Sequence, residues 1–270
     1  MPELPEVEIT RRGIEPYIVG DKVLTVVCRT KKLRWPIPTQ LTIKLTNQVF
    51  TSVSRRAKYL LLDCNAGTLI IHLGMSGSLR ITDSSSVVQK HDHLDVVFTK
   101  NILRLRDPRR FGAVLWTSKN ALSHKLLASL GPEPLHEEFT PQHLYQASRQ
   151  RRISVKEFIM NSHVVVGVGN IYATEALFTS GIHPLRAAGK ISLARYTLLV
   201  SAIKTILAEA IQRGGTTLRD FTREDGKPGY FQQQLRVYGR AKQPCVVCAQ
   251  PLRSTKQGQR TTTYCTQCQR

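Results

Sequence analysis

The stretch CVVCAQPLRSTKQGQRTTTYCTQC, residues 245–268, decides how the C-terminal part of the chain folds. It contains two Cys-x-x-Cys pairs, Cys245 with Cys248 and Cys265 with Cys268, separated by sixteen residues. Two pairs at this separation can supply four thiolates to a single tetrahedral zinc ion. Because four protein ligands leave no coordination position open for a substrate, the pattern predicts one structural Zn²⁺ per chain.

Disulfides and a redox-active Cys-x-x-Cys are the two other interpretations of these cysteines. A redox pair needs no second pair at a fixed spacing. The acidic N-terminus MPELPEVE resembles neither a signal peptide nor a transit peptide, so we expect reduced thiols. Ala249 departs from the glycine that often follows the second cysteine and eases a left-handed turn. Cys28 and Cys64 lie in apolar runs and are expected in the core.

The charge of the chain points to its partner. Its 270 residues include 39 Lys and Arg against 19 Asp and Glu, a formal net charge of +20. This excess predicts a polyanion, either nucleic acid or an anionic membrane surface, and no run of about 18 apolar residues is available to span a bilayer. Residues 226–270 contain basic side chains but no Asp or Glu. Such a segment is a nucleic-acid contact surface or a disordered basic tail, and its cysteines favour the contact surface.

Short β-branched runs recur between residues 22 and 116, separated by polar or Gly-containing turns. Seven short strands at this spacing predict a β-sandwich. Residues 2–17 predict a helix, with Pro2 in its first turn and Glu3 and Glu6 near its positive end. The predicted strands are VLTVVC (23–28), LTIKL (41–45), YLLLDC (59–64), LIIHL (69–73), HLDVVF (93–98), ILRLR (102–106) and AVLW (113–116).

The pattern becomes helical after LGPEPL at 130–135, whose prolines and glycine indicate a hinge. Apolar residues then recur about every 3.6 positions in four runs, at 142–150, 153–161, 171–181 and 192–214. A Gly- and Thr-rich loop at 215–230 precedes the cysteines. We therefore expect a multidomain α+β chain with a β-sandwich domain at 1–129, a hinge at 130–140, a helical domain at 141–228 and a zinc finger at 229–270.

Six motifs occur in order along the chain: MPELPEVE (1–8), RRAKYLLL (55–62), HLGMSGSLR (72–80), DPRRFG (107–112), VGVGNIYATEALF (166–178) and the four cysteines. Together they resemble formamidopyrimidine-DNA glycosylase, a bacterial family of DNA base-excision repair, from Pro2 to Cys268. The resemblance implies a β-sandwich flanked by helices, a helix–two-turns–helix domain and a four-cysteine zinc finger. It implies a monomer in the bacterial cytoplasm or nucleoid, with no obligate protein partner.

The activity implied by the resemblance is that of a bifunctional glycosylase and abasic-site lyase, which excises oxidised purines from duplex DNA. Pro2 would be the nucleophile once Met1 is removed, because its secondary amine is partly neutral near pH 7 and can form an imine with the sugar. Glu3 would move protons during ring opening and elimination. Lys58 and Arg260 would reach the two phosphates and assist β,δ-elimination. Without the resemblance, Pro2 and Glu3 would be ordinary helix-start residues.

The same resemblance assigns the DNA contacts. A base inside a duplex must be extruded, and apolar side chains fill the gap that it leaves. Met75, Arg109 and Phe111 match the family's inserted trio; otherwise Met75 and Phe111 would be core residues. Loop 215–230 would close over the extruded base. The remaining predicted phosphate or lesion contacts are His91, Arg110, Arg151, Lys156 and Asn170, each of which could otherwise be a solvated polar side chain, and Glu175 is a further carboxylate near the site.

Three other functions stay open from the sequence. The first is a pyrimidine-lesion glycosylase of the endonuclease VIII branch, which usually has Gly where Leu4 stands and lacks the Arg-Arg-Phe run. The others are a non-catalytic zinc protein that binds DNA or RNA, and a zinc-finger transcription factor, for which no effector segment is visible. Asn161 replaces an acidic residue common in the family, so the helical junction there is expected to differ.

Overall fold

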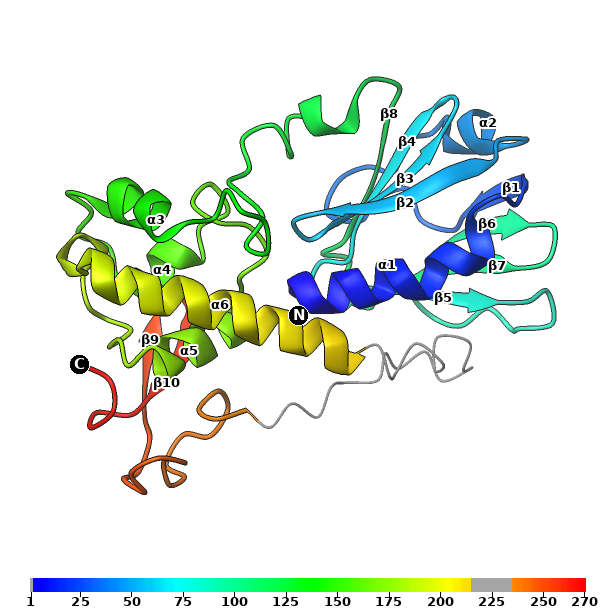
Figure 1. Ribbon diagram of the computed structural model, residues 1–270. Coiled ribbons are helices and arrows are strands. Elements are labelled where there is room, and N and C mark those ends of the chain that lie inside the picture. Colours follow the sequence, from blue (N-terminus) through cyan, green and yellow to red (C-terminus); the bar gives the residue numbers. More distant parts are fainter. Residues whose placement is uncertain (1, 215–234) are drawn as a thin grey trace. The chain divides into compact units, whose positions relative to one another are not determined.

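The computed structural model describes residues 2–214 and 235–270, so the predicted loop 215–230 lies outside the described residues. The described chain divides into two compact units. Residues 2–128 with 211–214 form the first, called here the β unit, and residues 129–210 with 235–270 form the second, the helical unit. Figure 1 shows the elements of each.

Helix α1, Leu4–Ile18, opens the β unit. Glu3 is its N-cap residue, and the Glu6 side chain accepts a hydrogen bond of 2.8 Å from the Glu3 backbone N–H. That contact satisfies one of the donors that a helix start leaves unpaired. Pro2 therefore precedes the helix instead of lying in its first turn, and it is Pro5 that stands within that turn. The prediction of a helix here is confirmed, but the place given to Pro2 in it was wrong.

The β unit also contains two antiparallel four-stranded sheets (Figure 1). One has the order β1-β6-β7-β5 and the other β2-β3-β4-β8. Their apolar faces contribute Val26, Leu94, Leu105, Leu62 and Ile71 to one buried cluster, which makes the unit a sandwich as predicted. The strands are β1 (Val23–Cys28), β2 (Phe50–Arg56), β3 (Tyr59–Cys64), β4 (Gly67–His72), β5 (Ser78–Thr82), β6 (Asp92–Phe98), β7 (Ile102–Arg106) and β8 (Ala113–Thr117).

The run LTIKL differs from its prediction as a strand. It forms the short helix α2, Leu41–Leu45. Leu41 and Leu45 are buried one helical turn apart, whereas Ile43 between them is 81% exposed. A strand would have placed all three side chains on one face, so burial of the two leucines selects the helix. Strands β2 and β5 were missed, because FTSVSRR and SLRIT contain few apolar residues.

The outer face of the β1-β6-β7-β5 sheet carries buried charges. Arg104 binds Asp95 through two hydrogen bonds, Nε to Oδ1 at 2.8 Å and Nη2 to Oδ2 at 2.9 Å. Arg80 binds Asp92 at 2.8 Å, and Asp92 also accepts the backbone N–H of Gln89 at 2.9 Å. Such pairs are costly to break because each leaves a buried charge without its partner. They hold the β5–β6 connection, residues 83–91, against the sheet.

The four predicted helices are α3 (Pro141–Ser148), α4 (Val155–Ile159), α5 (Asn170–Thr179) and α6 (Leu193–Gly214), and all of them belong to the helical unit except the last four residues of α6. The Thr140 side chain accepts the N–H of His143 at 3.1 Å, and the Ser154 side chain accepts that of Glu157 at 3.2 Å, so α3 and α4 begin with side-chain caps. Their apolar faces meet in a second buried cluster. Two short 3₁₀ turns complete the described helices, η1 (Ala121–Ser123) in the β unit and η2 (Ala188–Lys190) in the helical unit.

The C-terminal segment of the helical unit is a two-stranded hairpin, β9 (Arg253–Gln257) and β10 (Arg260–Tyr264). Gly258 and Gln259 make its turn with φ angles of +48° and +64°, as a tight hairpin requires. The cysteine pairs flank the hairpin. None of the helices among the described residues has the length and apolar character needed to span a bilayer.

Candidate functional site

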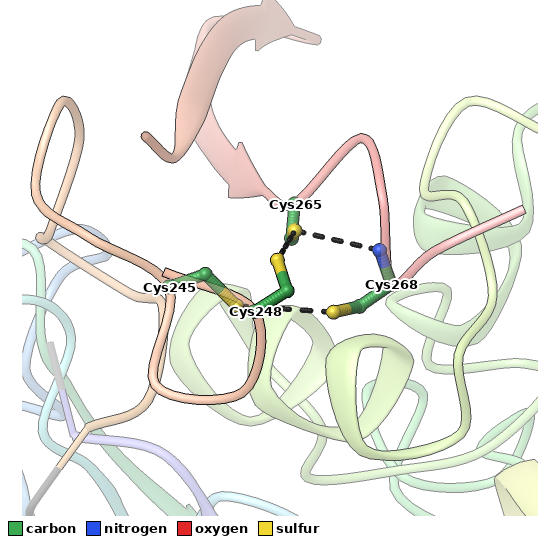
Figure 2. Close-up of side chains that lie close together, drawn as sticks. All are labelled: Cys245, Cys248, Cys265 and Cys268. Carbon is green, nitrogen blue, oxygen red and sulfur yellow. Dashed lines mark hydrogen bonds between the residues drawn. The ribbon is translucent and has the colours of Figure 1, made fainter. Parts of the chain in front are cut away.

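The four cysteines of the C-terminal pairs converge on one point (Figure 2). Their sulfur atoms all lie within 4.8 Å of one another, with Cys245 Sγ 3.9 Å from Cys268 Sγ and Cys248 Sγ 3.4 Å from Cys265 Sγ. Thiolates bound to one tetrahedral zinc at about 2.3 Å lie about 3.8 Å apart, so the arrangement fits the ion.

The backbone around these cysteines also suits zinc. The Val247 N–H points to Cys245 Sγ at 3.5 Å, and the Cys268 N–H points to Cys265 Sγ at 3.4 Å. Ala249, where a glycine was expected, takes the left-handed conformation with φ of +61°, so alanine tolerates the turn here. The nearby apolar cluster is small and includes Phe178, Val237 and Leu252. So small a core predicts that zinc supplies much of the order of this segment.

The predicted nucleophile and acid lie together at the start of α1. Pro2 is half-buried and adjoins Glu3, of which 1% is exposed. Further along the helix, Glu8 accepts a hydrogen bond from Arg55 Nε of β2 at 3.1 Å. Burial acts to raise the pKa of Glu8, but hydrogen bonds and charges from Arg11, Arg12 and Arg55 outweigh it and lower the pKa. The ionised Glu8 thus ties α1 to the strand that leads to Lys58.

Lys58 lies in the tight turn between β2 and β3. The turn is enforced by Ala57, whose φ is +56°. On the adjacent strand β4, His72 faces the Tyr59 ring, with centroids 4.8 Å apart. Burial first, and then the charges of Lys58 and Arg34, lower the pKa of His72 to about 4. His72 is therefore a neutral neighbour of the predicted phosphate-binding lysine.

Two adjoining loops carry the predicted inserted trio. The Met75 loop (residues 73–77) joins β4 to β5, and the Arg109 loop (residues 107–112) joins β7 to β8. Met75 is 39% exposed and Phe111 is 44% exposed, which argues against the alternative that both are core residues. The Arg109 guanidinium lies 4.8 Å from the Phe111 ring centroid, in cation–π contact. The structure therefore brings the Arg109 and Phe111 side chains together on a loop that adjoins the one bearing Met75.

His91, just before β6, and Arg110, within the Arg109 loop, have backbone φ angles of +77° and +56°, unusual values for residues with side chains. Partial desolvation first, and then nearby cations including Lys90 and Arg106, lower the pKa of His91. The buried ion pairs of the sheet, Arg104 with Asp95 and Arg80 with Asp92, hold the segment 83–91 that carries His91.

Lys156 and Asn170 meet inside the helical unit. Lys156 is 1% exposed, and its Nζ donates to Asn170 Oδ1 at 2.6 Å and to Thr262 Oγ1 at 2.7 Å. Asn170 in turn donates from Nδ2 to the Thr261 carbonyl at 3.2 Å. The start of α5 is thereby joined to β10, one residue from the exposed Arg260. The structure thus brings two of the predicted contacts, Lys156 and Asn170, together.

Glu175 has a clear structural partner that the sequence did not reveal. Its carboxylate accepts three backbone N–H groups, from Arg236 at 2.9 Å, Val237 at 2.9 Å and Tyr238 at 2.8 Å. Glu175 is 5% exposed, so these bonds lie in a poorly hydrated place. They fix the segment that enters the zinc hairpin to helix α5. Arg151, another predicted phosphate contact, is exposed in the connection between α3 and α4.

Asp107 and Ser76 were not predicted as site residues. Asp107, the first residue of the Arg109 loop, is fully buried, and it accepts the hydroxyl of Ser76 in the Met75 loop at 2.7 Å. A carboxylate placed between an apolar strand and a Pro-Arg-Arg turn is the one sequence signal that could have identified it. Asn161, at the position of the usual acidic residue, accepts the His163 N–H at 2.9 Å through its side chain, so the helical junction keeps a local cap.

Three family models match consecutive parts of the chain: formamidopyrimidine-DNA glycosylase N-terminal domain over residues 1–114, formamidopyrimidine-DNA glycosylase H2TH domain over 130–222, and zinc finger found in FPG and IleRS over 242–270. Two relatives named formamidopyrimidine-DNA glycosylase, from Nitrosococcus oceani and Stutzerimonas stutzeri, are 58% and 59% identical over 100% of both chains.

The chain is also similar in structure to solved structures of Lactococcus lactis Fpg. Its complex with DNA containing an abasic site matches with 33% identity and a TM-score of 0.89, covering 99% of each chain. Its complex with DNA containing FAPY-dG matches with 32% identity and a TM-score of 0.88, again over 99% of each chain. The fold and the four-cysteine site thus define the class of zinc-finger DNA glycosylases. The chain belongs to the formamidopyrimidine-DNA glycosylase family, which confirms the predicted family, fold class and structural zinc.

Proposed function

We propose that this protein removes oxidised purines, 8-oxoguanine and formamidopyrimidines, from double-stranded DNA and then cleaves the strand at the resulting abasic site. The observation that carries the proposal is the pair of adjoining loops that expose Met75 and Phe111 beside Arg109. Exposed apolar side chains next to a cation suit insertion into a base stack, where Met75 and Phe111 replace lost stacking and Arg109 binds the orphaned base.

Pro2 supplies the nucleophile once Met1 has been removed. Its secondary amine attacks the sugar C1′, the C1′–N bond to the damaged base breaks, and the base leaves with a proton. Glu3 donates a proton to the ribose ring oxygen as the ring opens, which leaves an iminium between Pro2 and the sugar. The buried position of Glu3 beside Pro2 supports this pairing.

The iminium acidifies the neighbouring C2′ position, so loss of a proton there expels the 3′ phosphate in β-elimination. A second elimination expels the 5′ phosphate, and hydrolysis then frees the Pro2 amine. Lys58 and Arg260 serve these steps by binding the two departing phosphates. The half-buried place of Lys58 in its turn and the exposed Arg260 on the zinc hairpin support these roles.

The remaining predicted contacts hold the DNA backbone. Asn170 stands at the N-terminal end of α5, where backbone N–H groups and the helix dipole favour phosphate. Lys156 fixes the Asn170 side chain and adds positive charge there. His91, Arg110 and Arg151 bind phosphates along the strand. We place the protein in the bacterial cytoplasm or nucleoid as a monomer, with the domain boundaries expected from its sequence.

Borohydride trapping tests this function on a duplex that carries one 8-oxoguanine opposite cytosine. Borohydride reduces an imine to a stable amine, so Met1-processed, zinc-replete protein should form a covalent protein–DNA adduct. Protein that retains Met1, in which the Pro2 nitrogen is an amide and cannot form an imine, should lose the adduct while keeping binding of the duplex. A duplex without the lesion is the matched control substrate. Absence of an adduct from processed wild-type protein would leave a DNA-binding protein without lyase chemistry.

A second experiment, on a duplex that carries an oxidised thymine, separates this function from that of the pyrimidine-lesion branch. Faster excision of oxidised guanine is expected, because Arg109, Arg110 and Phe111 are present and Leu4 stands where that branch usually has glycine. Faster excision of the thymine lesion would reassign the substrate without changing the imine chemistry.

A further inference from the structure

We propose that Asp107 is a positioning residue that locks three DNA-facing segments into one arrangement before DNA arrives. The segments are the Met75 loop, the Arg109 loop and the residues around His91. The inference rests on the proposed function of Met75, His91, Arg109 and Phe111, and it assigns a role to a side chain that has no direct part in that chemistry.

The Asp107 carboxylate joins the first two segments. Oδ1 accepts the Ser76 hydroxyl at 2.7 Å, and Oδ2 accepts the Gly112 backbone N–H at 2.7 Å. The Ser76 oxygen also accepts the backbone N–H of Arg109 at 3.2 Å. A continuous chain of hydrogen bonds therefore runs from one end of the Arg109 loop, through Ser76 of the Met75 loop, to Arg109 itself. None of the Asp107 residue is exposed, so water does not compete for these bonds.

The Asp107 backbone joins the third segment. Its N–H donates to the His91 carbonyl at 3.1 Å, and its carbonyl lies 2.9 Å from His93 Nε2. Its carbonyl also accepts the Arg110 N–H at 3.2 Å. These bonds hold His91 and Arg110 in the left-handed backbone conformations that would otherwise be costly for residues with side chains.

Glycines show how closely the two loops approach. A Cβ at Gly74 would lie 2.4 Å from the Phe111 carbonyl carbon. A Cβ at Gly112 would lie 2.8 Å from the His72 carbonyl oxygen and 3.0 Å from Asp107 Oδ2. Backbone therefore packs on backbone around the carboxylate, so a shift of one loop must move the other. Met75 and Phe111 are thus presented as a unit, which lowers the entropy cost of inserting them into DNA.

Asp107→Asn and Ser76→Ala test this role with two readouts. The first is the rate at which a fluorescent base beside 8-oxoguanine unstacks in a duplex, together with single-turnover excision. The second is cleavage of an abasic site in single-stranded DNA, where there is no helix to invade. Both variants should slow duplex unstacking and excision about tenfold or more, which corresponds to the loss of one buried hydrogen bond, and change single-strand cleavage less than about threefold.

Two further variants keep the test decisive. Ser76→Thr retains the hydroxyl and should restore the duplex rates. Thr68→Val removes a similar hydroxyl–carboxylate bond, of 2.6 Å to Asp63 Oδ1, away from these loops and should leave both rates unchanged. If Asp107→Asn does not fold, as judged by circular dichroism, Ser76→Ala carries the test, because Ser76 is not fully buried.

Equal loss of duplex and single-strand activity in the variants, or no loss of either, would overturn the positioning role while leaving the proposed function standing. Wild-type protein that neither unstacks nor excises the lesion would overturn the proposed function and this inference with it.

Discussion

Lys156 Nζ lies 2.6 Å from Asn170 Oδ1, although only 1% of Lys156 is exposed. A buried ammonium group is tolerated because it donates to Asn170, to Thr262 Oγ1 at 2.7 Å and, at 3.5 Å, to the Thr261 carbonyl. The lysine thus connects the start of α5 to the zinc hairpin.

Replacing Lys156 by Met should lower the free energy of unfolding by about 1–3 kcal/mol, because buried acceptors on Asn170 and Thr262 lose their donor. Chemical denaturation measures this. Lys204→Met is the control, since Lys204 donates to the His136 carbonyl at the surface, where water can replace it. An unchanged or increased stability of the Lys156 variant would show that desolvating the ammonium group costs more than its hydrogen bonds return.

Removing zinc should unfold the C-terminal hairpin and leave the β unit folded. The apolar cluster beside the four cysteines is too small to hold the hairpin alone. Treatment with a strong chelator, followed by circular dichroism and a nicking assay, should show partial loss of structure and complete loss of strand cleavage, both restored by added zinc. Cys268→Ser should behave like the chelated protein, and Cys28→Ser should keep its zinc. Full nicking by zinc-free protein would contradict the structural role.

Acid should destabilise the β unit through His72. Its pKa is lowered from 6.5 to about 4 in the fold, chiefly by burial and then by Lys58 and Arg34. Its Nδ1 accepts the Gly74 N–H at 3.0 Å, and protonation would end that acceptance. Between pH 6.5 and 4 the unfolded chain therefore binds the extra proton, so stability falls as the pH falls through this window, by up to roughly 3 kcal/mol for this group.

Thermal unfolding of wild-type protein and of His72→Asn across that pH range measures the effect. Asn keeps an acceptor for Gly74 but does not titrate, so the variant should lose less stability on acidification. His124→Asn is the control, because His124 is also half-buried but its pKa is lowered by burial and by Lys125, away from Lys58 and Arg34. Parallel pH profiles for wild type and His72→Asn would show that His72 is not the titrating group.

Glu175→Gln should loosen the segment that leads into the zinc hairpin. The neutral amide accepts more weakly than a carboxylate, and its NH₂ group cannot accept from the three N–H groups that Glu175 now binds. Amide hydrogen exchange at Arg236, Val237 and Tyr238 should accelerate at least about tenfold, the effect of losing one charged hydrogen bond. Glu137→Gln, at an exposed position of the same unit, should leave these amides protected. Unchanged amide exchange in Glu175→Gln would show that the Glu175 carboxylate does not hold residues 236–238 in place.

Binding to undamaged duplex should weaken steeply with salt. Each phosphate contact releases counterions, and a plot of log affinity against log salt should fall with a slope of about −0.9 for each contact. Arg151→Gln should reduce the slope by about one contact, whereas Lys44→Gln on α2 should leave it unchanged. A flat salt response would contradict the interpretation of the +20 charge.

Local patterns predicted much of this fold. The alternation of apolar residues identified the core strands, and the cysteine spacing identified the metal site, because both signals are complete within a short stretch of chain. LTIKL was ambiguous for the same reason: four apolar or β-branched residues out of five suit a strand, until the burial of Leu41 and Leu45 selects a helix.

The contacts that organise the site depend on residues far apart in sequence. Ser76 meets Asp107 from another loop, and Glu175 meets residues 236–238 across more than sixty positions. Hydrogen-bond partners at such separations are set by tertiary packing, which a single sequence does not display. The motifs could therefore place Met75 and Phe111 on loops, but not the carboxylate that fastens those loops together.

The dependence of the hairpin on four thiolates has a thermodynamic consequence. Because the folded segment binds zinc and the unfolded segment binds it weakly, mass action makes the stability of the hairpin grow with free zinc, by about 1.4 kcal/mol for each tenfold increase above the dissociation constant. The stability of the hairpin that carries Arg260 thus depends on the concentration of free zinc around the protein. Zinc scarcity would lower the ratio of folded to unfolded hairpin in proportion, without any change to the β unit.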